Sequence, residues 1–234
     1  MEFTEKDLSL LIGELKGPGD EKYKKFNDSL IPGIEEYSFG VRIPEVRKIA
    51  KRILKSDWRG FLKLTRRSDI YEIRLMRGIV TAGAPCSLEE RFDLLRDFIP
   101  EINNWAVCDC VSGELKYFAK NKEKAHDFLL SYLDSEDEFE VRFACVTLMR
   151  WFTDGEHIRE LFTLYERVKH EGYYVKMAVA WGVSVCLVKF RDETLEWLKS
   201  CTLDDFTFNK SLQKAIESYR IASEDKELLR KMKR

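Results

Sequence analysis

Apolar residues recur with helical spacing along the chain, and several of these segments repeat one another every 34 residues. Each copy has an aromatic residue followed two positions later by an apolar β-branched residue. The aromatic residues are Tyr71, Trp105, Phe139 and Tyr173. The β-branched residues are Ile73, Val107, Val141 and Val175. A fixed period of about 20 to 50 residues is typical of stacked supersecondary units that cannot bury their apolar faces alone. The pattern therefore predicts an internal repeat.

Helix start and stop signals predict a dozen or more helices joined by short connections. Gly17 ends the first helix, Pro44 opens the third, and Ser87 with Glu90 forms a capping box for a later one. Further helices are expected after Asp69 and Ser87. The other expected ranges are 5–16, 20–30, 44–56, 104–119, 122–133, 138–152, 156–170, 173–190, 193–200, 209–220 and a charged tail at 225–234.

Helix pairs stacked at this period build an α-solenoid with a convex and a concave layer. The period equals that of tetratricopeptide repeats, but the Trp, Leu-Gly, Tyr and closing Pro pattern of those repeats is absent. We therefore expect an all-α protein with one HEAT-like α-solenoid domain over residues 1–234 and a concave groove.

A second column lies three positions after the aromatic one and is basic in four of five copies. It reads Arg74, Cys108, Arg142, Lys176 and Lys210. The basic residues form either a solvated face or a ladder that follows a phosphate backbone, with Arg77 and Lys214 one turn further along. A denser basic cluster surrounds the expected helix at 44–56. It consists of Arg42, Arg47, Lys48, Lys51 and Arg52. We expect both groups to bind phosphate.

The column after the basic one is interrupted by a single carboxylate. It reads Leu75, Asp109, Phe143, Met177 and Ser211. Because burial of an unpaired carboxylate is costly, Asp109 must face a groove, pair with a cation or accept hydrogen bonds. Trp105 precedes it by one helical turn, Arg142 comes from the next repeat and Trp181 from the one after. These four side chains are candidates to line one concavity.

Each of these residues also has a structural interpretation. Trp105 stands in a column that is aromatic in every copy, so it can be a core residue. Trp181 stands in a column of mostly small residues, where an indole is unusual. Arg142 can simply pair with a neighbouring carboxylate such as Glu138 or Asp109.

The composition restricts the function further. Lys and Arg total 40 and Asp and Glu 41, giving a formal net charge of −1, so the bulk charge indicates no partner and any nucleic-acid binding needs local positive charge. The 6 cysteines form no CxxC pair and are expected to be free thiols in a reducing compartment. The 3 histidines lack metal-ligand spacing, so we expect no metal. The longest apolar run is too short to cross a bilayer, so we expect no membrane.

Four stretches carry a resemblance to a known family. They are FGVRIPEVRKIAK at 39–51, NNWAVCD at 103–109, FEVRFACV at 139–146 and YYVKMAVAWGV at 173–183. The chain resembles the AlkD-like family of DNA alkylation-repair glycosylases, which are HEAT-like solenoids that remove cationic alkylated purines. In that family a tryptophan, an aspartate four residues later, an arginine and a second tryptophan form the active site. Those positions match Trp105, Asp109, Arg142 and Trp181.

The resemblance implies a monomeric, cytoplasmic and nucleoid-associated DNA glycosylase that needs no cofactor and acts on double-stranded DNA containing alkylated bases. Asp109 would stabilise the oxocarbenium-like sugar and orient water, the two indoles would pack on the deoxyribose, and Arg142 would hold a phosphate. Some branches keep the fold and lose the activity. The near-neutral charge leaves a catalytically inactive scaffold, binding DNA structures or a protein partner, as the alternative.

Overall fold

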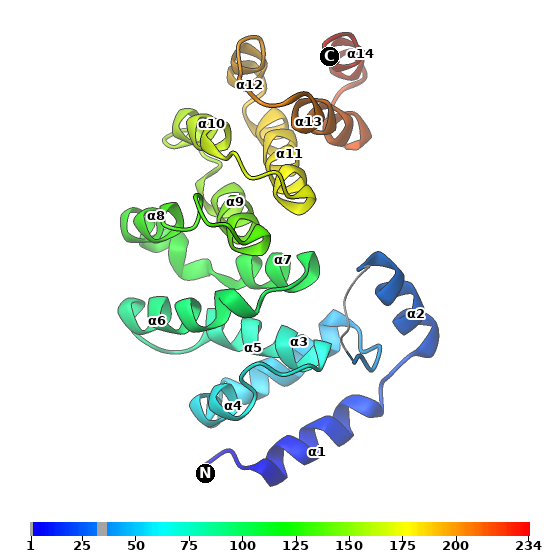
Figure 1. Ribbon diagram of the computed structural model, residues 1–234, viewed down its shortest axis with the longest axis vertical. Helices are drawn as coiled ribbons and strands as arrows, with labels where there is room; N and C mark the ends of the chain where they lie inside the picture. The colour runs from blue at the N-terminus through cyan, green and yellow to red at the C-terminus, as the bar shows by residue number, and fades with distance from the viewer. Residues whose placement is uncertain (1, 32–36) are drawn as a thin grey trace. The chain divides into compact units, whose positions relative to one another are not determined.

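The computed structural model describes residues 2–31 and 37–234 of the chain. Over these residues it contains fourteen α-helices and two short 3-10 segments, and no strand (Figure 1). The expected all-α fold is therefore confirmed. The α-helices are α1 Glu5–Lys16, α2 Glu21–Leu30, α3 Ile43–Ile53, α4 Trp58–Leu64, α5 Tyr71–Gly83, α6 Leu88–Phe98, α7 Trp105–Glu114, α8 Lys122–Leu130, α9 Glu138–Phe152, α10 Ile158–Arg167, α11 Tyr173–Lys189, α12 Arg191–Leu198, α13 Asp205–Glu217 and α14 Ser223–Lys231. The 3-10 segments are η1 Ile99–Glu101 and η2 Lys116–Lys120.

The chain divides into two compact units, Met1–Leu115 and Lys116–Arg234. In the first unit α5 is the central helix: α3 and α7 pack on it as one layer, and α4 and α6 pack on it as the other (Figure 1). In the second unit α9, α11 and α13 form one layer. The other layer consists of α8 and α10 against α9, α12 against α11, and α14 against α13. Each unit is thus a stack of helix pairs, as the repeat predicts. The expectation of a single domain over residues 1–234 stays a prediction.

The β-branched column forms the core of both units. Ile73, Val107, Val141 and Val175 lie on α5, α7, α9 and α11 and are all buried. Each stands in the first turn of its helix, so the 34-residue register places the same side chain at the same depth in every copy. Burying a valine or isoleucine side chain contributes about 1.5–3 kcal/mol. This column is therefore the apolar seam that holds each stack together.

Some of the expected helix boundaries are confirmed and others are wrong. The ranges 5–16 and 138–152 are confirmed as α1 and α9. The expected helix at 104–119 is wrong at its end, because α7 stops at Glu114 and Leu115 turns its side chain into the core with a ψ of 47°. The expected start at residue 209 is also wrong. The Asp204 carboxylate accepts a hydrogen bond from the Thr207 N–H and starts α13 at Asp205.

The helix α4 was not among the expected ranges. Its N-cap is Asp57, whose carboxylate accepts a hydrogen bond from the Gly60 N–H at 3.1 Å. Asp57 also accepts one from the Phe3 N–H, which fixes the residues before α1 against α4. Among the residues that the structure describes, no helix combines the length and apolar character needed to cross a bilayer.

Candidate active-site residues and nucleic-acid interface

Trp105 is the first residue of α7 in the first unit. Asn104 caps this helix, because its side-chain oxygen accepts a hydrogen bond from the Val107 N–H at 2.9 Å. The Trp105 indole is half-buried, and its Nε1–H donates to the carbonyl of Leu30 at the end of α2, at 3.1 Å. The edge of the indole is thus tied to a neighbouring helix, which fixes the orientation of the ring.

Asp109 follows Trp105 by one turn on the same helix, so the two side chains are neighbours on one face of α7. At the equivalent position of α5 and α9, Leu75 and Phe143 are fully buried. Asp109 is only half-buried. Met177, at the equivalent position of α11, is also half-buried. Asp109 thus retains access to solvent, which agrees with the requirement that a carboxylate not be buried unpaired.

Arg142 lies in the second turn of α9 in the second unit and is 6% exposed. Its Nη1 donates to the backbone carbonyl of Tyr174, in the first turn of α11, at 2.9 Å. A charged hydrogen bond to a neighbouring helix is stronger than a neutral one. Arg142 therefore ties the N-terminal turns of α9 and α11 together, and its guanidinium is held in place.

Trp181 lies in the middle of α11 and is half-buried. The guanidinium carbon of Arg150, from α9, lies 5.5 Å from the centroid of the indole, within the range of a cation–π contact. Within the second unit, the structure thus places Arg142 and Trp181 on adjacent packed helices. Trp105 and Asp109 belong to the first unit, and the assembly of all four residues into one site stays a prediction.

The cations of the basic column differ in what they contact. The Arg74 guanidinium donates to the carbonyls of Ser68 and Glu101, at 2.7 and 3.3 Å. Lys176 pairs with Glu171 at 2.6 Å, and Lys210 donates to the Gln213 side chain at 3.3 Å. Lys214 is half-buried on α13. None of these contacts tests the expected binding of phosphate.

The basic cluster lies on α3. Arg47 pairs with Glu114 of α7 at 3.1 Å and Lys48 with Glu45 at 2.7 Å, while Lys51 is exposed. An exposed ion pair such as Lys48–Glu45 contributes about 0–1 kcal/mol, whereas the Arg47–Glu114 pair is half-buried. Lys48 can therefore exchange its partner for a phosphate at low cost, and the DNA-binding role of Arg47, Lys48 and Lys51 stays a prediction.

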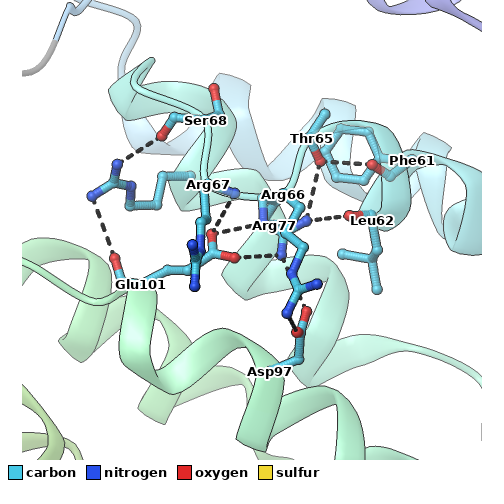
Figure 2. Close-up of polar contacts among 10 residues, drawn as sticks. Phe61, Leu62, Thr65, Arg66, Arg67, Ser68, Arg77, Asp97 and Glu101 are labelled. Carbon is cyan, nitrogen blue, oxygen red and sulfur yellow. Dashed lines mark hydrogen bonds and ion pairs between the residues drawn. The ribbon is translucent and has the colours of Figure 1, made fainter.

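Arg77 does not extend the expected phosphate-binding column (Figure 2). It is 1% exposed and binds Glu101 with two nitrogens, at 3.0 and 3.1 Å. It also donates to the Leu62 carbonyl, and burial lowers the pKa of the guanidinium, an effect that Glu101 partly offsets. The expectation that Arg77 contacts phosphate is wrong, because one turn beyond Arg74 the helix face is covered by the 3-10 segment that contains Glu101.

Two buried carboxylates are important for the first unit and carried no clear signal in the sequence. The Glu101 carboxylate binds Arg77 and also accepts a hydrogen bond from the Arg67 N–H. The Glu72 carboxylate accepts hydrogen bonds from the Phe39 and Val41 N–H groups, at 3.0 and 3.1 Å. Glu72 is fully buried and so fixes the segment before α3 against α5. A glutamate in the first turn of a helix is ordinary, and only its tertiary partners show that it is structural.

No group of three or more His, Cys, Asp or Glu side chains that could hold a metal ion occurs in the described ranges 2–31 and 37–234. The candidate residues thus belong to a stacked helical repeat protein with a half-buried carboxylate beside an indole. The chain belongs to the family described as DNA alkylation repair enzyme, whose model matches residues 12–219. Comparison with curated proteins and with solved structures gives no match. Membership of this family supports a role in the repair of alkylated DNA and implies binding to DNA.

Proposed function

We propose that the protein is a monofunctional DNA glycosylase that excises N3- or N7-alkylated purines from duplex DNA, as the first step of base excision repair. The observation that carries this proposal is the pair on α7: a half-buried Asp109 carboxylate one turn from Trp105, whose indole edge is fixed by the Leu30 carbonyl. Membership of the DNA alkylation repair family supports it.

The proposed reaction is hydrolysis of the N-glycosidic bond. An alkylated purine carries a positive charge, so it leaves with the electron pair of the bond to C1′ as a neutral base. The positive charge then passes to the sugar as an oxocarbenium-like species. Asp109 stabilises this charge and orients a water molecule, which adds to C1′ and loses a proton. The products are the free alkylated base and an abasic site.

The other three residues have binding roles in this proposal. The faces of Trp105 and Trp181 pack on the deoxyribose and stabilise its developing positive charge. Arg142 holds a phosphate next to the lesion, and its bond to the Tyr174 carbonyl supports this role because it orients the guanidinium in advance. No cofactor takes part in any of these steps.

The basic residues bind the phosphates that flank the lesion and so set the register of the DNA. They are Arg74, Lys176, Lys210, Lys214, Arg47, Lys48 and Lys51. A monomer acting in the cytoplasm on nucleoid DNA fits this proposal. A net charge of −1 means that attraction to DNA comes from these local groups and not from the whole surface.

The proposal is tested by the release of alkylated bases from methylated duplex DNA. Substitution Asp109→Asn keeps the size of the side chain and removes its charge, and we expect release to fall by about 10²–10³-fold while binding to the same duplex is retained. Asp93→Asn, which changes an exposed carboxylate on α6, is the matched control and should release bases at the wild-type rate. If wild-type protein releases no more base than Asp109→Asn, the glycosylase proposal is rejected.

The alternative is a catalytically inactive scaffold that binds DNA structures or a protein partner, and the near-neutral net charge favours it. Base release separates the glycosylase from the scaffold, and salt dependence separates a scaffold that binds DNA from one that binds a protein. Binding that neutralises several phosphates weakens steeply as salt rises, with a slope of about −0.9 per phosphate contact. A protein with neither base release nor DNA retention at low salt is a protein-binding scaffold.

A further inference from the structure

Four aromatic rings form a continuous row across the first turns of α9, α11 and α13 in the second unit. Phe139 lies 5.2 Å from Tyr174, Tyr174 lies 5.3 Å from Tyr173, and Tyr173 lies 6.1 Å from Phe206, measured between ring centroids. These separations are those of interacting aromatic pairs. We call these four residues the aromatic row.

The two ends of the aromatic row differ in burial. Phe139 and Tyr174 are half-buried and attach the row to the helices, whereas Tyr173 is 55% exposed and Phe206 is 39% exposed. An isolated exposed aromatic residue needs no explanation, but adjacent exposed rings form an apolar patch of the kind that marks a binding surface. The row thus offers two exposed rings to a ligand that is itself flat and apolar on its faces.

A lysine follows each exposed ring by about one helical turn. Lys176 follows Tyr173 on α11, and Lys210 follows Phe206 on α13, with its Nζ 5.9 Å from the centroid of the Phe206 ring. Aromatic faces beside cations, repeated on successive elements, are the arrangement by which proteins hold single-stranded nucleic acid without sequence preference. The rings stack on bases and the cations follow the phosphates.

Two carboxylates near the aromatic row, those of Glu171 and Asp204, have partners within the protein. Glu171 pairs with Lys176 at 2.6 Å. Asp204 accepts from the Thr207 N–H and hydroxyl, at 3.1 and 2.6 Å, and so caps α13. The pair of Lys176 with the exposed Glu171 is worth about 0–1 kcal/mol, so a phosphate can replace Glu171 at small cost. A nucleic acid supplies phosphates for Lys176 and Lys210, which an arginine-rich peptide does not.

We infer that the aromatic row is a stacking platform for unpaired bases of DNA, with Lys176 and Lys210 contacting the phosphates on either side. This goes beyond excision of an alkylated base from duplex DNA: it gives the protein an affinity for single-stranded or gapped segments. The stacking depends on the presence of bases and not on their identity, because every base has a π-face.

The test combines protein variants with changes in the DNA. Wild type binds a fluorescein-labelled oligothymidylate, and the double variant Tyr173→Ala with Phe206→Ala binds it roughly tenfold or more weakly. Tyr173→Phe keeps the ring and retains binding. Tyr219→Ala, which removes a fully exposed tyrosine outside the row, is the matched control and binds as wild type does.

Oligonucleotides with abasic positions separate stacking from phosphate contact. Wild type binds an oligonucleotide that has successive abasic sites as weakly as the double variant binds the intact one, and the two changes together cost no more than either alone. Equal binding of the abasic and intact oligonucleotides by wild type overturns the inference. So does a result in which the double variant loses affinity for an oligoarginine peptide and keeps its affinity for DNA.

Failure of this inference is distinguishable from failure of the proposed function. Release of alkylated bases that depends on Asp109, without any effect of abasic sites on binding, rejects the platform and leaves the glycosylase proposal standing. Binding that depends on bases, without base release, does the reverse. Thermal unfolding checks that the double variant is folded: the two rings are partly exposed, so only a modest decrease of Tm is expected from the lost ring contacts.

Discussion

The helices α5 and α11 occupy the same register in the two units, yet their aromatic residues differ in exposure and their basic residues differ in the groups that they contact. Tyr71 opens α5 and is 5% exposed, whereas Tyr173 opens α11 and is 55% exposed. Three positions later, Arg74 donates to two backbone carbonyls, whereas Lys176 pairs with the exposed Glu171 and lies 3.7 Å from Asp204. The aromatic residue that opens α5 is thus buried and the one that opens α11 is exposed, whereas the basic residues of both helices are half-buried and differ in their partners.

This difference shows what a repeat does and does not determine. The register fixes where a side chain stands on its helix, because residues 34 apart occupy equivalent turns. The neighbouring elements decide whether that side chain becomes a structural contact or a surface group. In the first unit, the segment that contains Glu101 covers α5 and provides partners for its arginines. The positions on α11 and α13 keep enough exposure to meet a ligand.

The largest effect on stability is expected for the buried ion pair of the first unit. Arg77→Ala leaves Glu101 as a buried carboxylate without its bidentate partner, and breaking such a pair costs about 3–5 kcal/mol. Urea unfolding should show this loss in the first unit. Lys48→Ala, which removes an exposed pair with Glu45, is the control and should change the free energy of unfolding by less than about 1 kcal/mol. Equal effects of the two substitutions would contradict the structural role of Arg77.

The next largest effect on stability is expected where a glycine lets two helices pack closely, and each unit has such a glycine. A Cβ added at Gly182 would overlap the Tyr165 hydroxyl, and one added at Gly78 would overlap Val111 and Phe98. Overpacking of this kind costs about 1–3 kcal/mol, so Gly182→Ala and Gly78→Ala should each lower the urea midpoint. On α1, Gly13 has open space around it, and Gly13→Ala should raise stability by about 0.5–1 kcal/mol. A neutral Gly182→Ala would show that α10 and α11 are not packed as closely as described.

The core could be predicted from the sequence because its signal is local and repeated. The β-branched column needs only helical spacing and a fixed period to place Ile73 and Val141 at the same depth, and both are buried. The burial of Arg77 could not be predicted. Its partner Glu101 lies 24 residues away in a short 3-10 segment, and no spacing rule brings the two together.

The candidate site also has features that the sequence predicts and features that it does not. That Trp105 and Asp109 share a helix face follows from their four-residue separation on α7. The hydrogen bond from the Trp105 indole to the Leu30 carbonyl spans 75 positions, and nothing in the repeat indicates it. The boundary between the two units, after Leu115, was also not visible, because the register of the repeat continues through it.

The second unit has its own charged contact, and its effect depends on pH. Burial raises the pKa of Asp154, but hydrogen bonds from Lys122 and His157 together outweigh this and hold the pKa well below its ordinary value of 3.8. A depressed carboxyl pKa gives stability that is fully present above the unfolded pKa and is lost as pH falls through the folded one. Urea unfolding between pH 7 and pH 2 should therefore show a loss below about pH 4 that Asp154→Asn reduces. An unchanged pH profile in this variant would rule out the contribution of Asp154.

The smallest effect on stability is expected for Lys176→Ala, and its comparison with Arg74→Ala is the most direct test of the difference between the units. Lys176→Ala removes a pair with the exposed carboxylate of Glu171 and should leave the free energy of unfolding within about 1 kcal/mol of wild type, while the salt slope of DNA binding falls by about one unit. Arg74→Ala should instead cost about 1–3 kcal/mol of stability, because the Ser68 and Glu101 carbonyls lose their donor. Both variants are measured by urea unfolding and by DNA binding between 50 and 200 mM salt, roughly the range over which phosphate contacts show themselves. If Lys176→Ala destabilises the fold and leaves the salt slope unchanged, the second unit uses its basic position as the first does, for a structural contact.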